Sequence, residues 1–71
     1  MKALEYPKVF KVLLDGGYIV VVAGKTYSVV DGGNMVGHIT EKMFRALIEN
    51  EVIKYRDTVR GHNYEYQYWE L

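Results

Sequence analysis

A chain of 71 residues is long enough for one domain, and its nine basic and nine acidic side chains give zero net charge at neutral pH. It has no cysteine, which excludes disulfides and thiolate metal sites, and two widely separated histidines do not suggest zinc. The balanced charge provides no overall field to hold a polyanion, and it favours self-association. The longest apolar run, Tyr18–Ala23, is far shorter than the roughly 20 residues of a membrane-spanning helix. We therefore expect a cytoplasmic protein without membrane segment, metal or cofactor.

The first expected element is a short helix over residues 6–16. Pro7 suits a first helical turn, because the N–H that proline lacks has no partner at that position. Gly16-Gly17 is expected to end the helix, since glycine adopts the left-handed cap without steric cost. The apolar side chains follow the spacing of one buried helix face: Val9, Phe10, Leu13 and Leu14.

A β-hairpin is expected next. The β-rich runs Tyr18–Ala23 and Thr26–Val30 are separated by Gly24-Lys25, a two-residue hairpin signal. Asp31-Gly32-Gly33-Asn34 then forms a turn, because it lacks both the lysine of a phosphate loop and the ligand count of a calcium loop. Met35–Ile39 is expected to be a short extended stretch, interrupted by a glycine, that adds a third strand to this half.

The second expected helix covers Glu41–Glu49. Thr40 is a good N-cap, and Ile39 and Phe44 are spaced for a hydrophobic staple across it. Asn50 is expected to take the left-handed conformation that ends the helix. The predicted buried stripe contains four residues: Met43, Phe44, Leu47 and Ile48.

The last expected element is a second hairpin, Val52–Val59 and Asn63–Trp69, around Arg60-Gly61-His62. Its return strand alternates cleanly, which puts three tyrosines on one face: Tyr64, Tyr66 and Tyr68. The favoured interpretation is that these rings cover the helix pair and keep their hydroxyls in water. The alternatives are a protein interface and a stacking platform for nucleic-acid bases.

The two halves of the chain resemble each other. With a shift of 34 positions, Lys8–Ile19 aligns with Lys42–Ile53 at four identical and four similar positions of twelve. This repeat predicts one α+β domain over residues 1–71, in αββαββ order, with helix–hairpin units at about 6–31 and 40–69. If a pseudo-twofold axis relates the units, Phe10 and Phe44 should meet near it, both buried.

An interface is predicted at the last strand. Residues 63–69 contain no proline, lysine or bulge signal to protect an edge, so the strand lies inside the sheet or pairs with another copy. The face that carries Trp69 would be difficult for so thin a monomer to cover. We therefore expect a homodimer with this strand or its face at the interface. The candidate interface residues are Tyr64, Tyr66, Tyr68 and Trp69.

A nucleic-acid surface is the second prediction. The best basic cluster is Lys42, Arg45, Lys54, Arg56 and Arg60. A helix with a basic hairpin would contact a phosphate backbone as a winged helix does. Acidic residues lie among these cations, however, so an ordinary salt-bridged surface is the favoured interpretation. Catalysis is not expected, because the single serine, Ser28, has no readable base and orienting partner, and no catalytic residue is predicted.

Several motifs resemble a group of small bacterial and prophage proteins, of which the YjhX-like family is the named member. The motifs are residues 13–19, 27–31, 36–40, 44–47 and 52–53. The resemblance implies a winged-helix-like fold and a bacterial or phage origin. Our favoured function is a non-catalytic interaction module that binds a protein partner or itself. The alternative is a small winged-helix DNA-binding transcriptional regulator that uses helix 41–49 and the hairpin around Arg60.

Overall fold

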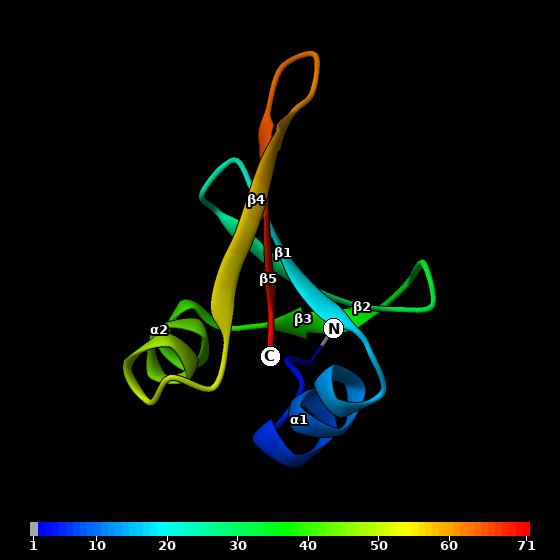
Figure 1. Ribbon diagram of the computed structural model, residues 1–71, viewed down its shortest axis with the longest axis vertical. Helices are drawn as coiled ribbons and strands as arrows, with labels where there is room; N and C mark the ends of the chain where they lie inside the picture. Colours follow the sequence, from blue (N-terminus) through cyan, green and yellow to red (C-terminus); the bar gives the residue numbers. More distant parts are fainter. Residues whose placement is uncertain (1) are drawn as a thin grey trace.

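The computed structural model describes residues 2–71, which form an α+β domain with two helices and a five-stranded antiparallel sheet (Figure 1). The elements in chain order are α1 (Tyr6–Leu14), β1 (Tyr18–Val22), β2 (Thr26–Asp31), β3 (Asn34–Ile39), α2 (Glu41–Glu49), β4 (Lys54–Arg60) and β5 (Glu65–Glu70). The order is therefore αβββαββ, and the αββαββ order predicted from the repeat is wrong, because Asn34–Ile39 forms the third strand of the first half.

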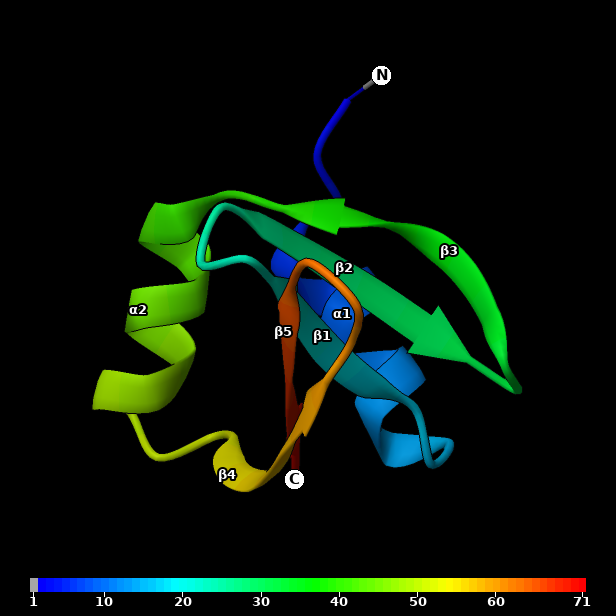
Figure 2. The same ribbon diagram turned by 90° about the horizontal axis from the view of Figure 1, so that it is seen from above.

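The strands are arranged in the order β3-β2-β1-β5-β4. The closing strand β5 lies inside the sheet, where Tyr68 pairs with Val20 of β1 on one side and with Asp57 of β4 on the other. The edges are therefore β3 and β4. The sheet is strongly twisted, so that in Figures 1 and 2 the β4–β5 hairpin crosses the direction of β2 and β3.

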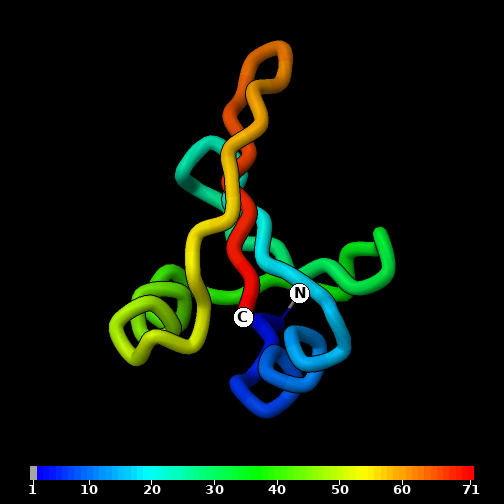
Figure 3. The backbone as a smooth tube through the Cα atoms, viewed as in Figure 1, coloured from blue at the N-terminus to red at the C-terminus, as the bar shows by residue number. Residues whose placement is uncertain are grey.

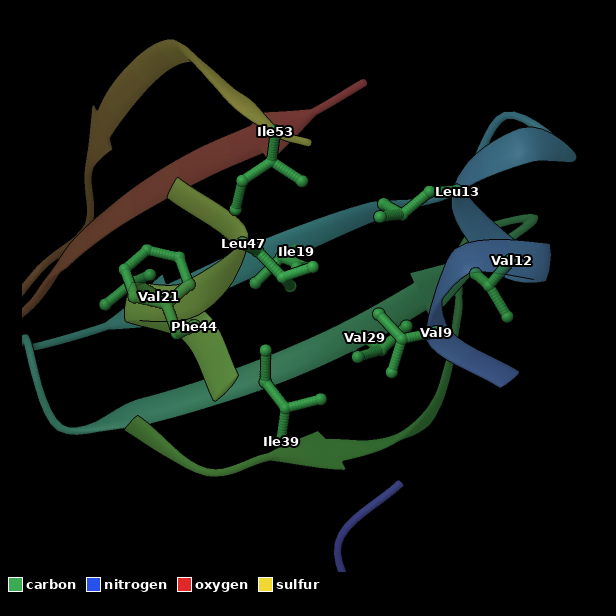
Figure 4. Packing of buried hydrophobic residues seen from close by; sticks show 10 residues of the cluster. All are labelled: Val9, Val12, Leu13, Ile19, Val21, Val29, Ile39, Phe44, Leu47 and Ile53. Atoms are coloured by element: carbon green, nitrogen blue, oxygen red, sulfur yellow. The ribbon is translucent and has the colours of Figure 1, made fainter. Parts of the chain in front are cut away.

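The core lies between the helices and one face of the sheet (Figure 4). Strand alternation sends Ile19 and Val21 of β1 to this face, and Ile19 is fully buried. Helix α2 contributes Phe44, whose ring lies against Tyr27 of β2 at 4.7 Å and edge-on to Trp69 of β5 at 5.3 Å. The buried cluster is Val9, Val12, Leu13, Ile19, Val21, Val29, Ile39, Phe44, Leu47 and Ile53.

The predicted ends of the helices are partly correct. Thr40 caps α2 as expected, because its hydroxyl accepts a hydrogen bond from the Met43 backbone N–H at 3.1 Å. Gly16 takes the left-handed conformation after α1, with φ of +94°. After α2, however, the left-handed residue is Glu51 (φ +56°), whereas Asn50 has φ of −91°. Asn50 instead donates its side-chain amide at 2.7 Å to the Ala46 carbonyl, which also accepts the Asn50 backbone N–H at 3.0 Å.

The predicted buried face of α1 is rotated in the structure. Val12 is buried, whereas Leu14 is 62% exposed and Phe10 is only partly buried, stacked on Tyr6 at 5.7 Å. The register of the repeat also differs from the predicted one. Both ends of α2 lie 35 positions after those of α1 (41 − 6 and 49 − 14), not 34. Thus Val9 and Val12 correspond to the buried Phe44 and Leu47, and the predicted meeting of Phe10 with Phe44 does not occur.

The sheet order also departs from the expected pseudo-twofold arrangement. A twofold axis relating the two units would exchange β1 with β4 and β2 with β5. The neighbours β1 and β5 would then require β4 beside β2, which the order β3-β2-β1-β5-β4 does not contain. The similarity between the halves therefore describes local helix-to-strand units and does not extend to the assembled sheet.

Candidate protein interface

Within residues 2–71, both helices pack on one face of the sheet, and neither lies over the second face. Its side chains alternate with those of the core, so Tyr18 and Val20 of β1 point away from the helices, between the buried Ile19 and Val21. Cross-strand pairing places Val30 of β2 opposite Tyr18, and Tyr66 of β5 opposite Val22. We call this surface the helix-free face. Its members include Tyr18, Val20, Val22, Ser28, Val30, His38, Val59, Tyr66 and Tyr68.

The structure divides the predicted aromatic set between two faces. Tyr66 and Tyr68 lie on the helix-free face, so they do not cover the helix pair as expected. Trp69 lies on the other face, where it packs against the core and makes edge contacts with Phe44 and Tyr55. Tyr64 precedes β5 and is 54% exposed. The covered face of β5 is therefore the one with Trp69, because α2 supplies the ring that packs against it.

Arg56 organises part of the helix-free face. A β-bulge between Tyr55 and Asp57 inserts Arg56 as an extra residue in β4. Its guanidinium carbon lies 5.2 Å from the ring centroids of both Tyr18 and Tyr68, in cation–π geometry. The same guanidinium donates a hydrogen bond to the Glu70 carboxylate at 3.1 Å. We call these four residues, Tyr18, Arg56, Tyr68 and Glu70, the Arg56 cluster.

Neighbouring carboxylates favour the charged form of the Arg56 guanidinium. The side-chain hydrogen bond from Arg56 to Glu70 raises the pKa of the guanidinium above its ordinary value, and Asp57 adds to this effect. Arg56 and Glu70 are 43% and 37% exposed, so the ion pair is accessible from solvent. From the sequence, Arg56 was predicted in a basic cluster, and Tyr18 was not predicted as a site residue. The alternation of Tyr18 with Val20 and Val22 was the signal that could have identified Tyr18, whereas no sequence signal indicated the bulge that positions Arg56.

The centre of the helix-free face is buried although neither helix of the described residues covers it. Val20 and Ser28 lie near its middle and are only 9% and 8% exposed. No helix lies above them, so the larger neighbouring side chains on the same face enclose them, and Tyr68 is directly opposite Val20. By contrast, Val59 is 48% exposed beside Tyr66, and Met35 is 64% exposed beside Val30. The face therefore has a packed centre and apolar side chains that reach solvent at both edge strands.

The predicted basic cluster does not form one surface. Arg45 is on α2 and pairs with Glu41 at 3.0 Å, whereas Arg56 pairs with Glu70 on the helix-free face. Arg60 lies at the end of β4 and pairs with Glu65 at 3.1 Å. The remaining members, Lys42 on α2 and Lys54 at the start of β4, are exposed. Each of the three arginines thus has an acidic partner, and the arrangement is a salt-bridged surface.

A shallow groove of about 360 Å³ runs along the helix layer. Tyr6 of α1 lies at one side of it, and Met43 and Leu47 of α2 lie at the other. Within residues 2–71, no group of three or more His, Cys, Asp or Glu side chains is placed to hold a metal ion. In the same part of the chain, neither helix is long and apolar enough to cross a membrane. The helix-free face takes side chains from all five strands, whereas the groove is lined mainly by α2.

The chain was compared with protein-family models, curated proteins and solved structures. No protein-family model, no curated protein and no solved structure matches the chain. The resemblance to the YjhX-like family therefore stays a prediction, and so does the function that it implies.

Proposed function

We propose that this chain is a non-catalytic interaction module, of bacterial or phage origin, that binds a protein through its helix-free face. The observation that carries the proposal is an aromatic and aliphatic sheet face with no second layer in a domain of 71 residues. Small domains have little apolar surface to bury, so an uncovered face of this kind is best explained by a partner. The bacterial or phage origin rests on the sequence resemblance.

The composition of the face supports a protein partner. Tyrosine and arginine are enriched among residues that dominate binding energy at protein interfaces, and the Arg56 cluster contains both. The rings of Tyr18 and Tyr68 lie 5.6 Å apart and are held by Arg56, so little conformational freedom is lost when a partner packs on them. A polar rim is present as well, because Asp57 and Glu70 border the rings.

The edges of the sheet are less suited to binding. Both edge pairings, β2–β3 and β4–β5, contain a bulge, which disrupts the ladder that an added strand would extend. Strand β4 also carries Lys54, Arg56 and Arg60, and charged residues on an edge oppose strand addition. On β3, the Leu4 backbone N–H already donates to the His38 carbonyl at 2.8 Å. A partner is therefore expected on the face and not along an edge.

Site-specific photo-crosslinking tests the proposal in cells that naturally contain the protein. A benzophenone amino acid at Met35, which is 64% exposed on the helix-free face, should give adducts with protein. The matched control is the same amino acid at Leu14, which is 62% exposed on α1 in the helix layer and should give none. No protein adduct at Met35, or equal adducts at both positions, would contradict binding through this face.

A small winged-helix DNA-binding regulator is the second candidate. The observation that favours it is the β4–β5 hairpin, which extends beyond the rest of the molecule like a wing (Figure 3) and has Arg60 near its tip. A gel-shift titration with random duplex DNA at physiological salt tests it. Balanced charge leads us to expect no complex. A low-micromolar complex that disappears on changing Arg45, Arg56 and Arg60 together to Ala would favour the regulator.

A further inference from the structure

We infer that the protein partner is a second copy of this chain, packed with its helix-free face against the same face of the first. The twofold axis runs across the strands, so that the Arg56–Glu70 pair of one copy lies against the reversed pair of the other. This inference rests on the proposed function, because it uses the same face, and it names the occupant and the orientation.

The charge of the face favours a copy of itself. Near β4 the helix-free face carries two cations, Lys54 and Arg56, and two anions, Asp57 and Glu70. A twofold interface is self-complementary when each charge can meet its opposite, since residue i contacts residue j and residue j contacts residue i. A partner of strongly one-sided charge, such as a nucleic acid, would leave one sign unpaired. The whole chain has zero net charge, so two copies also approach without long-range repulsion.

The arrangement of apolar residues selects the direction of the axis. An axis parallel to the strands would place β4 of one copy over β3 of the other, because the sheet order is β3-β2-β1-β5-β4. That arrangement would bury Lys54 and Asp57 against the exposed Met35 and Val36 of β3. An axis across the strands instead places β3 on β3 and β4 on β4. Because the axis passes through the Arg56 cluster, the four charges then meet the same four charges in reversed order.

The extent of the face is compatible with a stable interface. An interface of standard size buries about 800 Å² on each partner. That area is about a sixth of the 4972 Å² surface of this chain. The helix-free face takes side chains from all five strands and forms one side of the two-layer molecule. Two antiparallel sheets that pack face to face also form a common and well-packed architecture, with strands within about 30° of each other.

A charge-exchange experiment tests the inference on purified protein by sedimentation equilibrium at tens of micromolar. The wild type is expected at twice its 8.2 kDa mass. Arg56→Glu alone and Glu70→Arg alone each place like charges across the axis, so each should weaken association by about tenfold or more. Mixing the two variants brings opposite charges together again and should restore a mixed dimer. The double variant, with both changes in one chain, should associate as the wild type does.

The helix layer supplies a matched control. Arg45 and Glu41 of α2 form an ion pair of similar length, 3.0 Å against 3.1 Å, away from the proposed interface. Arg45→Glu should leave the association constant unchanged. Met35 is 64% exposed, and its partner Val30 lies opposite Tyr18 of the Arg56 cluster, so Met35 is near the axis. If the Arg56 or Glu70 variants unfold, Met35→Lys serves instead. It should abolish the dimer, whereas Leu14→Lys on α1 should not.

The outcomes separate this inference from the proposed function. A wild-type monomer at tens of micromolar overturns the second copy as partner, but adducts of Met35 with a different protein would still support the proposed function. A wild-type dimer, together with no mixed dimer when the two single variants are combined, overturns the face-to-face arrangement. Absence of both a dimer and any adduct at Met35 contradicts the inference and the proposed function together.

Discussion

At the scale of single residues, two positions show how backbone conformation departs from residue preference. Ala23 and Glu51 have φ of +54° and +56°, a region in which side chains other than glycine are disfavoured. Ala23 lies with Gly24 at the centre of the first hairpin turn, one residue earlier than Gly24-Lys25 was expected to be. Glu51 follows α2, where its backbone N–H donates to the Ile48 carbonyl at 3.0 Å. The left-handed conformation at these two positions is therefore set by the geometry of the turns and not by the preference of the residues that occupy them.

Glu51→Gly should increase the free energy of unfolding by about 0.5–1 kcal/mol. Glycine adopts the left-handed conformation without steric cost, and this gain exceeds the extra entropy that glycine gives the unfolded chain. Urea unfolding followed by circular dichroism measures the change. The control is Ala46→Gly inside α2, which should lower the free energy of unfolding by about 1 kcal/mol. A destabilising effect of Glu51→Gly would show that the Glu51 side chain contributes more than its backbone conformation costs.

At the scale of elements, helix α2 packs against the sheet through aromatic contacts, including one with β5. Phe44 is 8% exposed and lies between Tyr27 of β2 and Trp69 of β5. Helix α1 contributes smaller buried residues, Val9 and Val12 among them, and its own Phe10 packs mainly on Tyr6. The two helices are thus similar in sequence and unequal in what they bury.

Phe44→Ala should lower the free energy of unfolding by about 3–5 kcal/mol, because it leaves a cavity in the core. In a domain of this size that loss is a large part of the total stability. Phe10→Ala should cost only about 1 kcal/mol, since its ring is partly exposed. Chemical unfolding of both variants at low temperature measures the difference. Equal losses would contradict the register of 35 that distinguishes these two residues.

At the scale of the whole molecule, the sheet has one covered face and one free face. Both helices pack on the side of Ile19 and Val21, which leaves the side of Tyr18 and Tyr68 without a second layer (Figures 2 and 4). A partner that binds only the folded chain stabilises it by mass action. Stability should therefore depend on concentration if a second copy supplies the missing layer.

The midpoint of thermal unfolding should rise by several degrees between about 1 and 100 micromolar protein. A ΔΔG of 1 kcal/mol shifts the midpoint of a domain of this size by about 4–8 °C. Met35→Lys should remove the concentration dependence and leave the midpoint near that of the dilute wild type. Differential scanning calorimetry over this range checks both. A midpoint that does not change with wild-type concentration would indicate that folding is not coupled to self-association.

The sequence by itself determined the local elements of this protein. Capping at Thr40, the glycines after α1, the alternation in β5 and the turn at residues 31–34 depend on neighbouring residues, so each was predicted near its observed place. Periodicity also identified Phe44 and Leu47 as core residues. For the candidate site, it correctly put Tyr66 and Tyr68 on the same face of the strand.

Only the tertiary structure decided which face of the sheet the helices cover. A strand with tyrosines on one side and a tryptophan on the other has two apolar faces, and periodicity does not say which one packs against a helix. The choice depends on contacts between distant segments, such as Phe44 with Trp69 and Ile19 with Trp69 across β1 and β5. The same long-range pairing placed β5 inside the sheet and brought Arg56, through a bulge, over Tyr18, which lies 38 positions earlier in the chain. Such contacts exist only when the whole sheet has formed, so the helix-free face is a property of the assembled fold.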